Sequence, residues 1–496
     1  MNTSPVTPQP RQDGSHVRSF YHLVGAGDAE LSCQGTACFV ARQLNSSRWS
    51  AAISQDQRLY CLGNCFAAPA SSSDTGRPRM KILSRAPIIL GPIIDGPISS
   101  LSASIKLRGY HALEEALRRL PVELIGAIEL SELRGRGGAG FPTGRKWRAV
   151  AAQKGSEKFV VANADEGDPG AYIDRFLLED DPHRLIEAMA IAGYAVGGTK
   201  GYVYLRKEYP RARIVLEQAL LEARRERFLG ERILSSNFSF DIELVIGQGS
   251  YVCGEETALL NSIEGRRPEV RLRPPYPSQC GLFERPTLIN NVETLASVPW
   301  IIRNGVEAFR TLGFSNSRGT KVLSLNSLFR NPGLYEVEFG MSIRKIVEDL
   351  GGGVNSGTLK GVIIGGPLAG IIPPSLLDTP LGFEELAKVG ASVGHGGVIA
   401  FDEHTAIAEL IHHVFDFAAY ESCGKCTPCR LGSRRIEQIF REIVKTGHAP
   451  AQEKTEGGKI VSALAITSLC GLGTGLAEFA RSAFRYYAEE LEPCFR

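Results

Sequence analysis

The sequence predicts a multidomain α/β protein with a helical C-terminal region. Its 496 residues exceed what one hydrophobic core organises, and a prior of about 150 residues per domain suggests three or four units. Strand-like segments occur at 159–162, 201–209 and 240–249. A helical segment at 212–227 separates the last two, the pattern of a parallel sheet covered by helices. From Asp402 onwards, apolar side chains recur at helical spacing instead.

The composition is that of an ordinary globular protein, with 43% hydrophobic residues, 22% charged residues and a net charge of +2. Near-neutrality argues against a nucleic-acid surface as the main function. Residues 1–20 lack the apolar core of a secretory signal and predict a flexible arm. Prolines interrupt the apolar stretch 86–98 well short of the roughly 18 residues of a membrane span. We therefore expect a cytoplasmic protein.

Four cysteines form two pairs in the segment 21–76. Four residues separate Cys33 from Cys38, and three separate Cys61 from Cys65. Such pairs suit a two-iron cluster, and on spacing alone they would equally suit zinc. The following segment, 77–109, is rich in proline, glycine and serine and predicts a linker.

The domain expected at 110–318 begins with helices and then places an acidic turn directly after its first strand. The turn contains Asn163, Asp165, Glu166 and Asp168. By itself this could be a solvated turn. At the carboxyl end of a parallel strand, however, these groups could bind the hydroxyls and ring edges of a nucleotide cofactor.

A glycine-rich loop precedes that strand, with Gly135, Gly137 and Gly140 in G-x-G-x-x-G spacing. The segment before it reads as a helix, so the dinucleotide fingerprint is incomplete and a plain surface turn is the alternative. Cations and a ring favour a cofactor. The residues concerned are Arg136, Arg145 and Lys146, which suit a phosphate, and Phe141, which could stack on a flat ring.

Two later segments have the same character. Residues 247–260 supply glycines, an aromatic ring and adjacent carboxylates, and residues 286–297 supply two asparagines and a threonine. Each could also be no more than the polar start of a helix. The residues concerned are Tyr251, Gly254, Glu255, Glu256, Asn290, Asn291 and Thr294.

Between 319 and 402 the pattern changes to a small α+β module. Alternation over 333–339 predicts a half-exposed hairpin with the strand at 322–327. Ser342 is placed to cap a helix over 343–352.

The helical region 403–496 carries the most specific motif. Cys423, Cys426 and Cys429 repeat at two-residue gaps, and Cys470 follows 40 residues after Cys429. Three closely spaced thiolates and a distant fourth suit a 4Fe-4S cluster. A zinc site usually takes two separated pairs, which would leave Cys426 redundant, and disulfides are less favoured still.

Together and in this order, these motifs resemble the flavin-bearing, NADH-oxidising subunit shared by respiratory complex I, NAD-reducing hydrogenases and NAD-dependent formate dehydrogenases. The resemblance runs from about Tyr110 to about Tyr487. It implies a Rossmann-like FMN/NAD-binding domain at 110–318, a ubiquitin-like β-grasp (SLBB-like) domain at 319–402 and a helical 4Fe-4S domain at 403–496. Residues 21–76 resemble a trimmed thioredoxin-like segment of the two-iron partner subunit, which implies a 2Fe-2S cluster at its four cysteines.

The same resemblance assigns contacts by motif. FMN contacts would be Gly135, Arg136, Gly137, Lys146, Asn163, Asp165, Tyr251, Gly254, Glu255, Asn290, Asn291 and Thr294. Further cofactor-binding positions would be Gly140 and Glu166, and NAD contacts would be Phe141, Asp168, Glu256, Arg273 and Tyr276, with Glu256 orienting the nucleotide. The chain departs from the family at Ala149, where relatives can offer a second ring for the adenine.

The implied activity is that of a diaphorase. NADH would pass a hydride to FMN, and electrons would then move singly through the 4Fe-4S cluster to or from partner subunits, with no obligatory proton-transfer residue. Those partners would be a 2Fe-2S thioredoxin-like subunit and an iron-sulfur, molybdopterin or hydrogenase subunit. We expect a soluble NAD-dependent formate dehydrogenase, with a hydrogenase or complex I as alternatives. The rival functions are an electron conduit or scaffold without flavin and a zinc-stabilised interaction protein.

Overall fold

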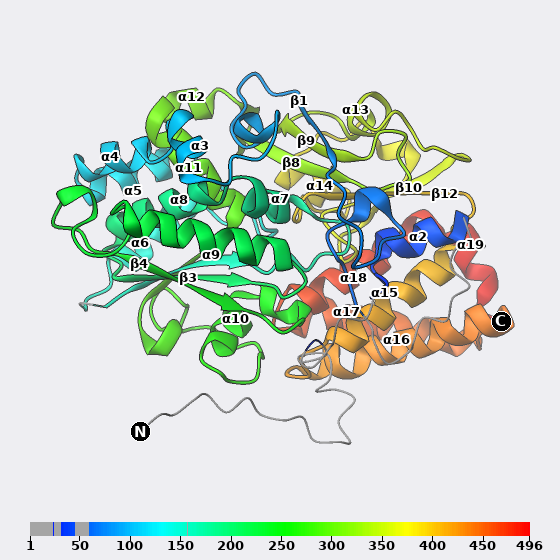
Figure 1. Ribbon diagram of the computed structural model, residues 1–496. Coiled ribbons are helices and arrows are strands. Elements are labelled where there is room, and N and C mark those ends of the chain that lie inside the picture. Colours follow the sequence, from blue (N-terminus) through cyan, green and yellow to red (C-terminus); the bar gives the residue numbers. More distant parts are fainter. Residues whose placement is uncertain (1–22, 24–30, 45–58, 156) are drawn as a thin grey trace.

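The computed structural model describes residues 23, 31–44, 59–155 and 157–496. The flexible arm expected at 1–20 lies outside the described residues. Figure 1 shows an α/β unit with a small sheet, a second unit with a larger sheet, and a bundle of long helices beside both. The expected mixed α/β architecture with a parallel sheet and a helical C-terminus is therefore confirmed.

The first sheet has four strands in the order β4-β3-β2-β5, and every neighbouring pair is parallel. Its strands are β2 (Phe159–Ala164), β3 (Lys200–Leu205), β4 (Asp241–Ile246) and β5 (Thr287–Asn291). Because all four run in one direction, their carboxyl ends meet at one edge. Val160, Val161, Ala162 and Val203 are fully buried, as expected when both faces of a parallel sheet are covered.

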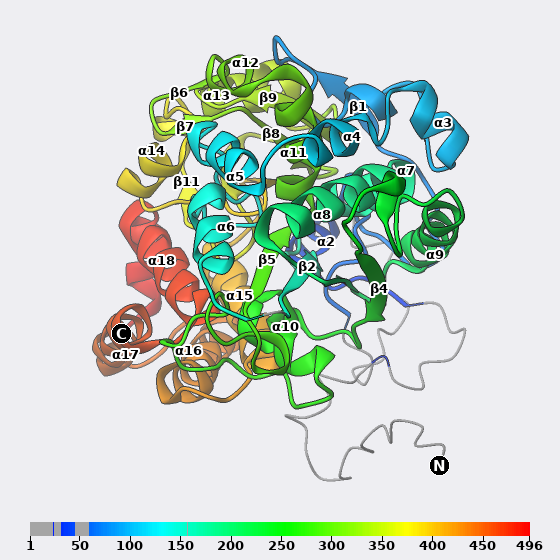
Figure 2. The ribbon, with the colours of Figure 1, turned by 90° about the vertical axis from the view of Figure 1, so that its left-hand side faces the viewer.

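Helices cover both faces of this sheet (Figure 2). Contacts with the strands place α8 (Pro182–Val196), α9 (Pro210–Arg225) and α11 (Val292–Asn304) on one face. On the other, Leu259 and Leu260 of α10 (Glu256–Ile263) pack against strand side chains such as Val161. The remaining helices of this unit are α4 (His111–Leu117), α5 (Pro121–Leu130), α6 (Thr143–Ala151), α7 (Ile173–Asp180) and α12 (Val306–Arg310).

The second sheet is mixed and has six strands in the order β1-β9-β8-β12-β10-β11. The strands are β1 (Arg79–Ile82), β8 (Thr320–Leu325), β9 (Gly333–Glu338), β10 (Leu359–Ile364), β11 (Ile371–Ile372) and β12 (Gly397–Asp402). As predicted, β8 and β9 form an antiparallel hairpin. The hydroxyl of Ser342 accepts a hydrogen bond from the Lys345 N–H at 3.3 Å and so caps α13 (Ile343–Lys345), which continues as one π turn over 346–350. The other helix of this unit is α14 (Phe383–Lys388).

The segment 77–109 differs from the expected linker, and it changes the environment of the hairpin. It contains β1, which pairs in parallel with β9, and α3 (Leu101–Lys106). Glu336, expected on an exposed face, is buried and accepts hydrogen bonds from the N–H groups of Ile88, Ile89 and Leu90 at 2.8–3.0 Å. The half-exposed hairpin was therefore a wrong prediction, because a polar residue in an alternating strand can also receive the backbone of a covering segment.

The C-terminal region contains the helices α15 (Ile407–Glu421), α16 (Thr427–Thr446), α17 (Ala451–Thr467), α18 (Gly471–Tyr486) and α19 (Ala488–Leu491). The triple-cysteine loop joins α15 to α16. The short helix α2 (Thr36–Leu44) from the N-terminal cysteine segment packs against α15, where the rings of Phe39 and His413 stack with centroids 4.2 Å apart.

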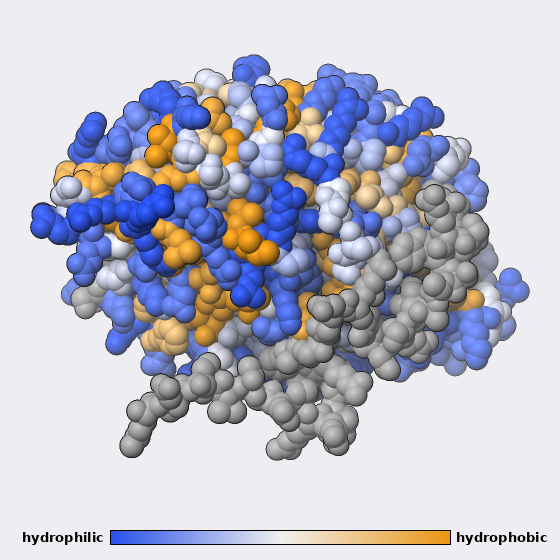
Figure 3. All heavy atoms as spheres, in the orientation of Figure 1, coloured by the Kyte–Doolittle hydropathy of each residue, from blue (hydrophilic) through white to orange (hydrophobic). Residues whose placement is uncertain are grey.

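The surface is varied in character. On the face drawn in Figure 3, hydrophilic residues predominate and hydrophobic ones form small groups between them. In the part of the chain that the structure describes, no helix is both long and apolar enough to span a bilayer.

Candidate functional site

The acidic turn after β2 lies at the edge where the parallel strands end, and neighbouring segments clasp it. The side-chain amide of Asn163 donates to the Gly254 carbonyl at 2.8 Å, and the Tyr251 hydroxyl donates to Asp168 Oδ1 at 2.7 Å. Residues from two segments that are about 90 positions apart in the sequence therefore form one wall of a site. This is the location at which parallel α/β sheets bind nucleotides.

The glycine loop is held by the start of α11, which directly follows β5 of the same sheet. The Arg136 N–H donates to Thr294 Oγ1 at 2.8 Å, and the Thr294 N–H donates to Asn291 Oδ1 at 3.1 Å, which caps the helix. A Cβ atom at Gly137 would lie 2.8 Å from the Asn291 Cβ, so only glycine fits there. Asn290 supports α6, because its Oδ1 accepts a hydrogen bond from the indole N–H of Trp147 in that helix at 3.1 Å.

Arg136 holds this loop through its backbone and also through its side chain, which donates to the Arg134 carbonyl at 3.0 Å. Its guanidinium is buried, donates to the Arg318 carbonyl at 2.7 Å and lies 4.8 Å from the centre of the Phe339 ring. Burial lowers the pKa of Arg136 to about 10. The side chain therefore ties the loop to the second sheet unit, whereas the sequence suggested a phosphate ligand.

Two cations and a carboxylate line the mouth of the site. Lys146 Nζ donates to Glu256 Oε2 and to the Ile289 carbonyl, both at 3.1 Å, and Arg273 lies 3.2 Å from Glu256 Oε1. Glu255 caps α10 by accepting from the Thr257 and Ala258 N–H groups at 2.9 Å.

Two aromatic rings stand exposed at the same mouth. Phe141 and Tyr276 are 49% and 53% exposed, and the Arg145 guanidinium lies 5.9 Å from the centre of the Phe141 ring. Exposed rings beside cations are the groups that bind the bases and phosphates of a dinucleotide.

The two carboxylates at the centre of the acidic turn have different roles. Glu166 is fully buried, and its oxygens accept from the N–H groups of Ile173, Asp174 and Arg175 at 2.7–3.1 Å and from the Tyr209 hydroxyl at 3.0 Å. It fixes the start of α7 and is already saturated with donors. Among the described residues, Asp165 Oδ2 is buried without a hydrogen-bond partner, and burial raises the pKa of Asp165 to about 8. An orphaned acceptor at this position suits a ligand that donates hydroxyl groups.

The C-terminal cysteines meet beside this site. Cys423 packs against Val252 and Ala258, and Leu469 and Cys470 adjoin the same small cluster. Cys426 and Cys470 are the N-cap residues of α16 and α18, a position that favours thiolates, but burial raises the pKa of Cys470 to about 11. A hydrogen bond from Cys429 and backbone N–H groups lower the pKa of Cys426 to about 5. The Ser422 hydroxyl lies 3.2 Å from Cys429 Sγ.

The N-terminal cysteines form a second group, and all four are buried. The sulfurs of Cys61 and Cys65 are 3.5 Å apart, and Cys33 lies within hydrogen-bonding range of Cys38 and Cys61. Backbone N–H groups of Gly35 and Gly63 point at cysteine sulfurs at 3.4 Å. Cys61 Sγ lies 3.8 Å from the Ala171 carbonyl, so this group adjoins the acidic turn.

No three cysteine sulfurs of the described residues lie within 4.8 Å of one another. Tetrahedral zinc with thiolate bonds of about 2.3 Å would hold its sulfurs about 3.8 Å apart. Among the described residues, the groups whose three ligand atoms all lie within 4.8 Å of one another are Glu166–Asp174–His395 and Asp402–Glu403–His404, and neither contains a cysteine. The close pair Cys61–Cys65 suits one iron of a two-iron cluster, in which each iron takes two thiolates.

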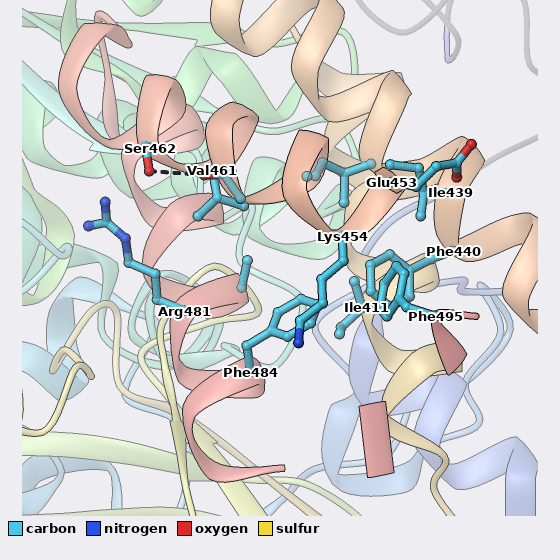
Figure 4. Close-up of a pocket in the computed structure, with 14 residues that line it drawn as sticks. Ile411, Ile439, Phe440, Glu453, Lys454, Val461, Ser462, Arg481, Phe484 and Phe495 are labelled. Carbon is cyan, nitrogen blue, oxygen red and sulfur yellow. Dashed lines mark hydrogen bonds between the residues drawn. The ribbon is translucent and has the colours of Figure 1, made fainter. Parts of the chain in front are cut away.

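Two cavities lie elsewhere. A cavity of about 250 Å³ between α16, α17 and α18 is lined by Phe440, Val461 and Phe484, and Figure 4 shows these side chains pointing into it. Another of about 400 Å³ lies behind the glycine loop, beside Gly138 and Arg481. Neither contains the acidic turn or a cysteine, so the candidate site is defined by its chemistry and not by cavity size.

Three buried side chains at the site were missed from sequence. Glu421 accepts the Tyr251 N–H at 3.0 Å, and Arg206 donates to the Cys61 carbonyl at 2.9 Å. His395 lies 3.0–3.2 Å from Asp174 and Glu166. Glu421 directly precedes the SCGKC motif, which could have drawn attention to it, whereas isolated residues such as Arg206 carry no signal in one sequence.

Comparison with known proteins gives consistent matches. The family model described as the Nuo51 FMN-binding domain matches residues 128–300, and that described as the NADH-ubiquinone oxidoreductase-F iron-sulfur binding region matches residues 409–494. The NADP-reducing hydrogenase subunit HndC of Solidesulfovibrio fructosivorans is 44% identical over 79% of this chain and 80% of its own length. The F 2 subunit of NADH-quinone oxidoreductase of Rhizobium meliloti (strain 1021) is 42% identical over 77% and 91%. A crystal structure of NAD+-reducing NiFe-hydrogenase in the H2-reduced state matches with a TM-score of 0.81 and 30% identity, over 97% of this chain and 87% of that one.

Proposed function

The chain belongs to the family of NADH-quinone oxidoreductase F subunits, and from this membership we propose how its site serves a soluble electron-transfer complex. As a member it is an NADH dehydrogenase flavoprotein subunit that holds FMN and a 4Fe-4S cluster. One observation carries the proposal. Tyr251 hydrogen-bonds Asp168 in the acidic turn, and its neighbour Val252 packs against Cys423 of the cysteine loop.

The residues present fit FMN between the glycine loop and the acidic turn. Gly137 packs against Asn291, and a Cβ at the neighbouring Gly138 would meet no atom within 4 Å, so the loop backbone there is bare, as a bound phosphate or ribityl chain requires. The orphaned Asp165 oxygen would accept a ribityl hydroxyl, and Asn163 and Glu255 would flank the ring. Lys146 would supply a cation near the phosphate, and Thr294 would hold the loop backbone in place through its hydroxyl. Glu166 would shape the turn from behind.

The mouth of the site would take NAD(H). Phe141 and Tyr276 offer faces for stacking, Arg273 offers a cation, and Glu256 orients both Lys146 and Arg273. Ala149 offers no second ring, so the adenine would be held from one side. The ion pair between Lys146 and Glu256 would then lie between the FMN site and the NAD(H) site.

When bound, FMN supplies hydride acceptance from NADH and release of single electrons to a cluster. The chain itself contributes by positioning the two cofactors. Its glycine loop and acidic turn hold reacting rings in stacking distance, which is the main source of rate in such a reaction. Cys423, Cys426, Cys429 and Cys470 would hold the cluster next to Tyr251, so that electrons have a short path out.

Two further modules belong to this proposal. The mixed sheet at 319–402, which wraps the helix begun by Ser342, supports a β-grasp domain. The segment 21–76 would be a trimmed thioredoxin-like unit holding a 2Fe-2S cluster at Cys33, Cys38, Cys61 and Cys65. Four buried thiols with N–H donors to sulfur support it, because such donors stabilise bound thiolates.

We further propose that the chain works in a cytoplasmic complex with a formate dehydrogenase or a hydrogenase subunit. Two matches to hydrogenases support this: the structural match to the NAD+-reducing hydrogenase extends over 97% of the chain, and the sequence match to HndC extends over 79%. Mass spectrometry of co-purifying subunits tests this. A molybdopterin subunit would indicate formate, a nickel-iron subunit hydrogen, and membrane quinone-reducing subunits would contradict the proposal.

Purified chain provides the test of the function itself. It should be yellow-brown, release FMN on denaturation and reduce ferricyanide with NADH. Brown protein without flavin would favour the conduit, and colourless protein with stoichiometric zinc would favour the interaction protein.

A further inference from the structure

A buried histidine faces two buried carboxylates directly behind the glycine loop. His395 Nε2 lies 3.0 Å from Asp174 Oδ2 and 3.2 Å from Glu166 Oε1, within ion-pair distance although without hydrogen-bond geometry, and His395 is only 6% exposed. The histidine comes from the loop before β12, and the carboxylates come from α7 and the acidic turn. Three elements of the chain therefore meet at this point.

The cluster is better explained as an ion triad than as a metal site. Both oxygens of Glu166 already accept hydrogen bonds, from three N–H groups and the Tyr209 hydroxyl, which leaves a metal little to bind. Burial of two carboxylates together is costly unless a cation lies between them. Although burial opposes its charge, Asp174 and Glu166 raise the pKa of His395 well above 6.5.

The triad connects to the loop through one amide. Asp174 Oδ2 also accepts from Asn291 Nδ2 at 2.6 Å, and Asn291 in turn caps α11 through Thr294. Thr294 holds the Arg136 N–H of the glycine loop. From the other side, Gly394 forms a β-bridge with Gly138 of the same loop. His395 is thus adjacent in sequence to one support of the loop and linked through Asp174 to the other.

We propose that His395 is a positioning residue for the flavin: its imidazolium holds Asp174 in place, and Asp174 holds Asn291 and the glycine loop against FMN. This inference rests on the proposed placement of FMN at that loop. Two other buried cations nearby are already paired, Lys321 with Glu293 and Arg206 with Glu208. Replacing His395 with a neutral residue leaves two facing carboxylates, and Asp174 is then repelled from its place.

The test is a double-mutant cycle on FMN affinity. FMN is removed from the full chain, and its Kd is measured by quenching of FMN fluorescence for wild type, His395→Gln, Asp174→Asn and the double variant. We expect His395→Gln to weaken binding about tenfold, or about 1.4 kcal/mol. Because His395 acts through Asp174, replacing His395 should have little further effect once Asp174 has been replaced. In the Asp174→Asn background, His395→Gln should therefore change Kd less than about twofold, which is the scatter expected between independent sites.

The matched control is His413→Gln, another imidazole, stacked on Phe39 at the contact with α2. It should leave Kd unchanged. The flavin midpoint potential gives a readout that a purely structural role would not move: loss of the positive charge should lower it in His395→Gln and not in His413→Gln.

Two results would overturn the inference: an unchanged Kd in His395→Gln, or additive effects of the two substitutions. If His395→Gln does not fold by circular dichroism, Asp174→Asn alone decides, because it must weaken FMN binding if Asp174 holds Asn291. A wild-type chain that binds no FMN would instead contradict the proposed function, so the two failures are distinguishable.

Discussion

Removing a single hydroxyl group should loosen the glycine loop. Thr294 is 1% exposed, and its Oγ1 accepts the Arg136 N–H at 2.8 Å. Thr294→Val keeps the shape of the side chain and removes the acceptor. Thr294→Ser keeps the acceptor and removes a methyl group, so it is the matched control.

The magnitude follows from the unpaired donor. A buried N–H left without a partner costs about 1–3 kcal/mol. Without FMN, the loop of Thr294→Val can open and hydrate that N–H, whereas FMN binding requires the loop in place. The penalty therefore falls on binding, and Kd should rise about 5- to 150-fold.

The assay is fluorescence titration of flavin-free protein with FMN. Thr294→Ser should bind within about threefold of wild type, which is less than 1 kcal/mol. Equal affinities for Thr294→Val and wild type would refute the assignment of this hydrogen bond to flavin binding. A loss in Thr294→Ser as large as in Thr294→Val would show that packing, and not the hydroxyl, matters.

Three further predictions concern the clusters and one buried acid. Cys426→Ser should lower iron from about six to about two per chain while NADH still bleaches the flavin, because Cys426 lies outside the proposed flavin contacts; loss of flavin too would argue against separate sites. Cys61→Ser should instead leave about four irons, and iron equal to wild type would contradict a cluster there. Burial raises the pKa of Glu187 from 4.5 to about 7, so the folded protein retains a proton that the unfolded chain loses above pH 4.5. Stability from this group is present below 4.5 and falls as pH rises to about 7, by about 3 kcal/mol over that range. Glu187→Gln should therefore reduce the drop in melting temperature between pH 5 and pH 8 in differential scanning fluorimetry, and an unchanged drop would contradict the shift.

Much of the architecture was predictable because it rests on local periodicity. The helical period after Asp402 and the apolar strand before Asn163 each reflect one face of an element, which a single sequence displays directly. Three of the four strands of the first sheet and the hairpin at 320–338 were found on that basis, whereas the segment of β5 (Thr287–Asn291) was interpreted only as the polar start of a helix. Ser342 was identified as a cap because capping depends on neighbours in sequence.

The rest depends on contacts between distant segments. Glu336 alternates like an exposed strand residue, and only the covering segment 79–93 makes it an acceptor for buried N–H groups. Arg136 stands between two glycines as a phosphate ligand would, yet its guanidinium faces the second sheet unit. Glu166 is a carboxylate in the turn where a cofactor contact is expected, yet it accepts N–H groups at the start of α7 instead. His395 has no motif at all, and its two partners lie over 200 positions away.

The central claim is that this chain passes electrons from NADH through FMN to an iron-sulfur cluster beside it. The most direct measurement is an anaerobic titration of the purified chain with NADH, followed by visible absorption and low-temperature electron paramagnetic resonance. The account predicts that the flavin band bleaches and that the signal of a reduced 4Fe-4S cluster appears in wild type and is absent in Cys426→Ser. A flavin band that stays unbleached at excess NADH would contradict the account. So would a bleached flavin with the 4Fe-4S cluster still oxidised, if dithionite reduces that cluster in the same sample.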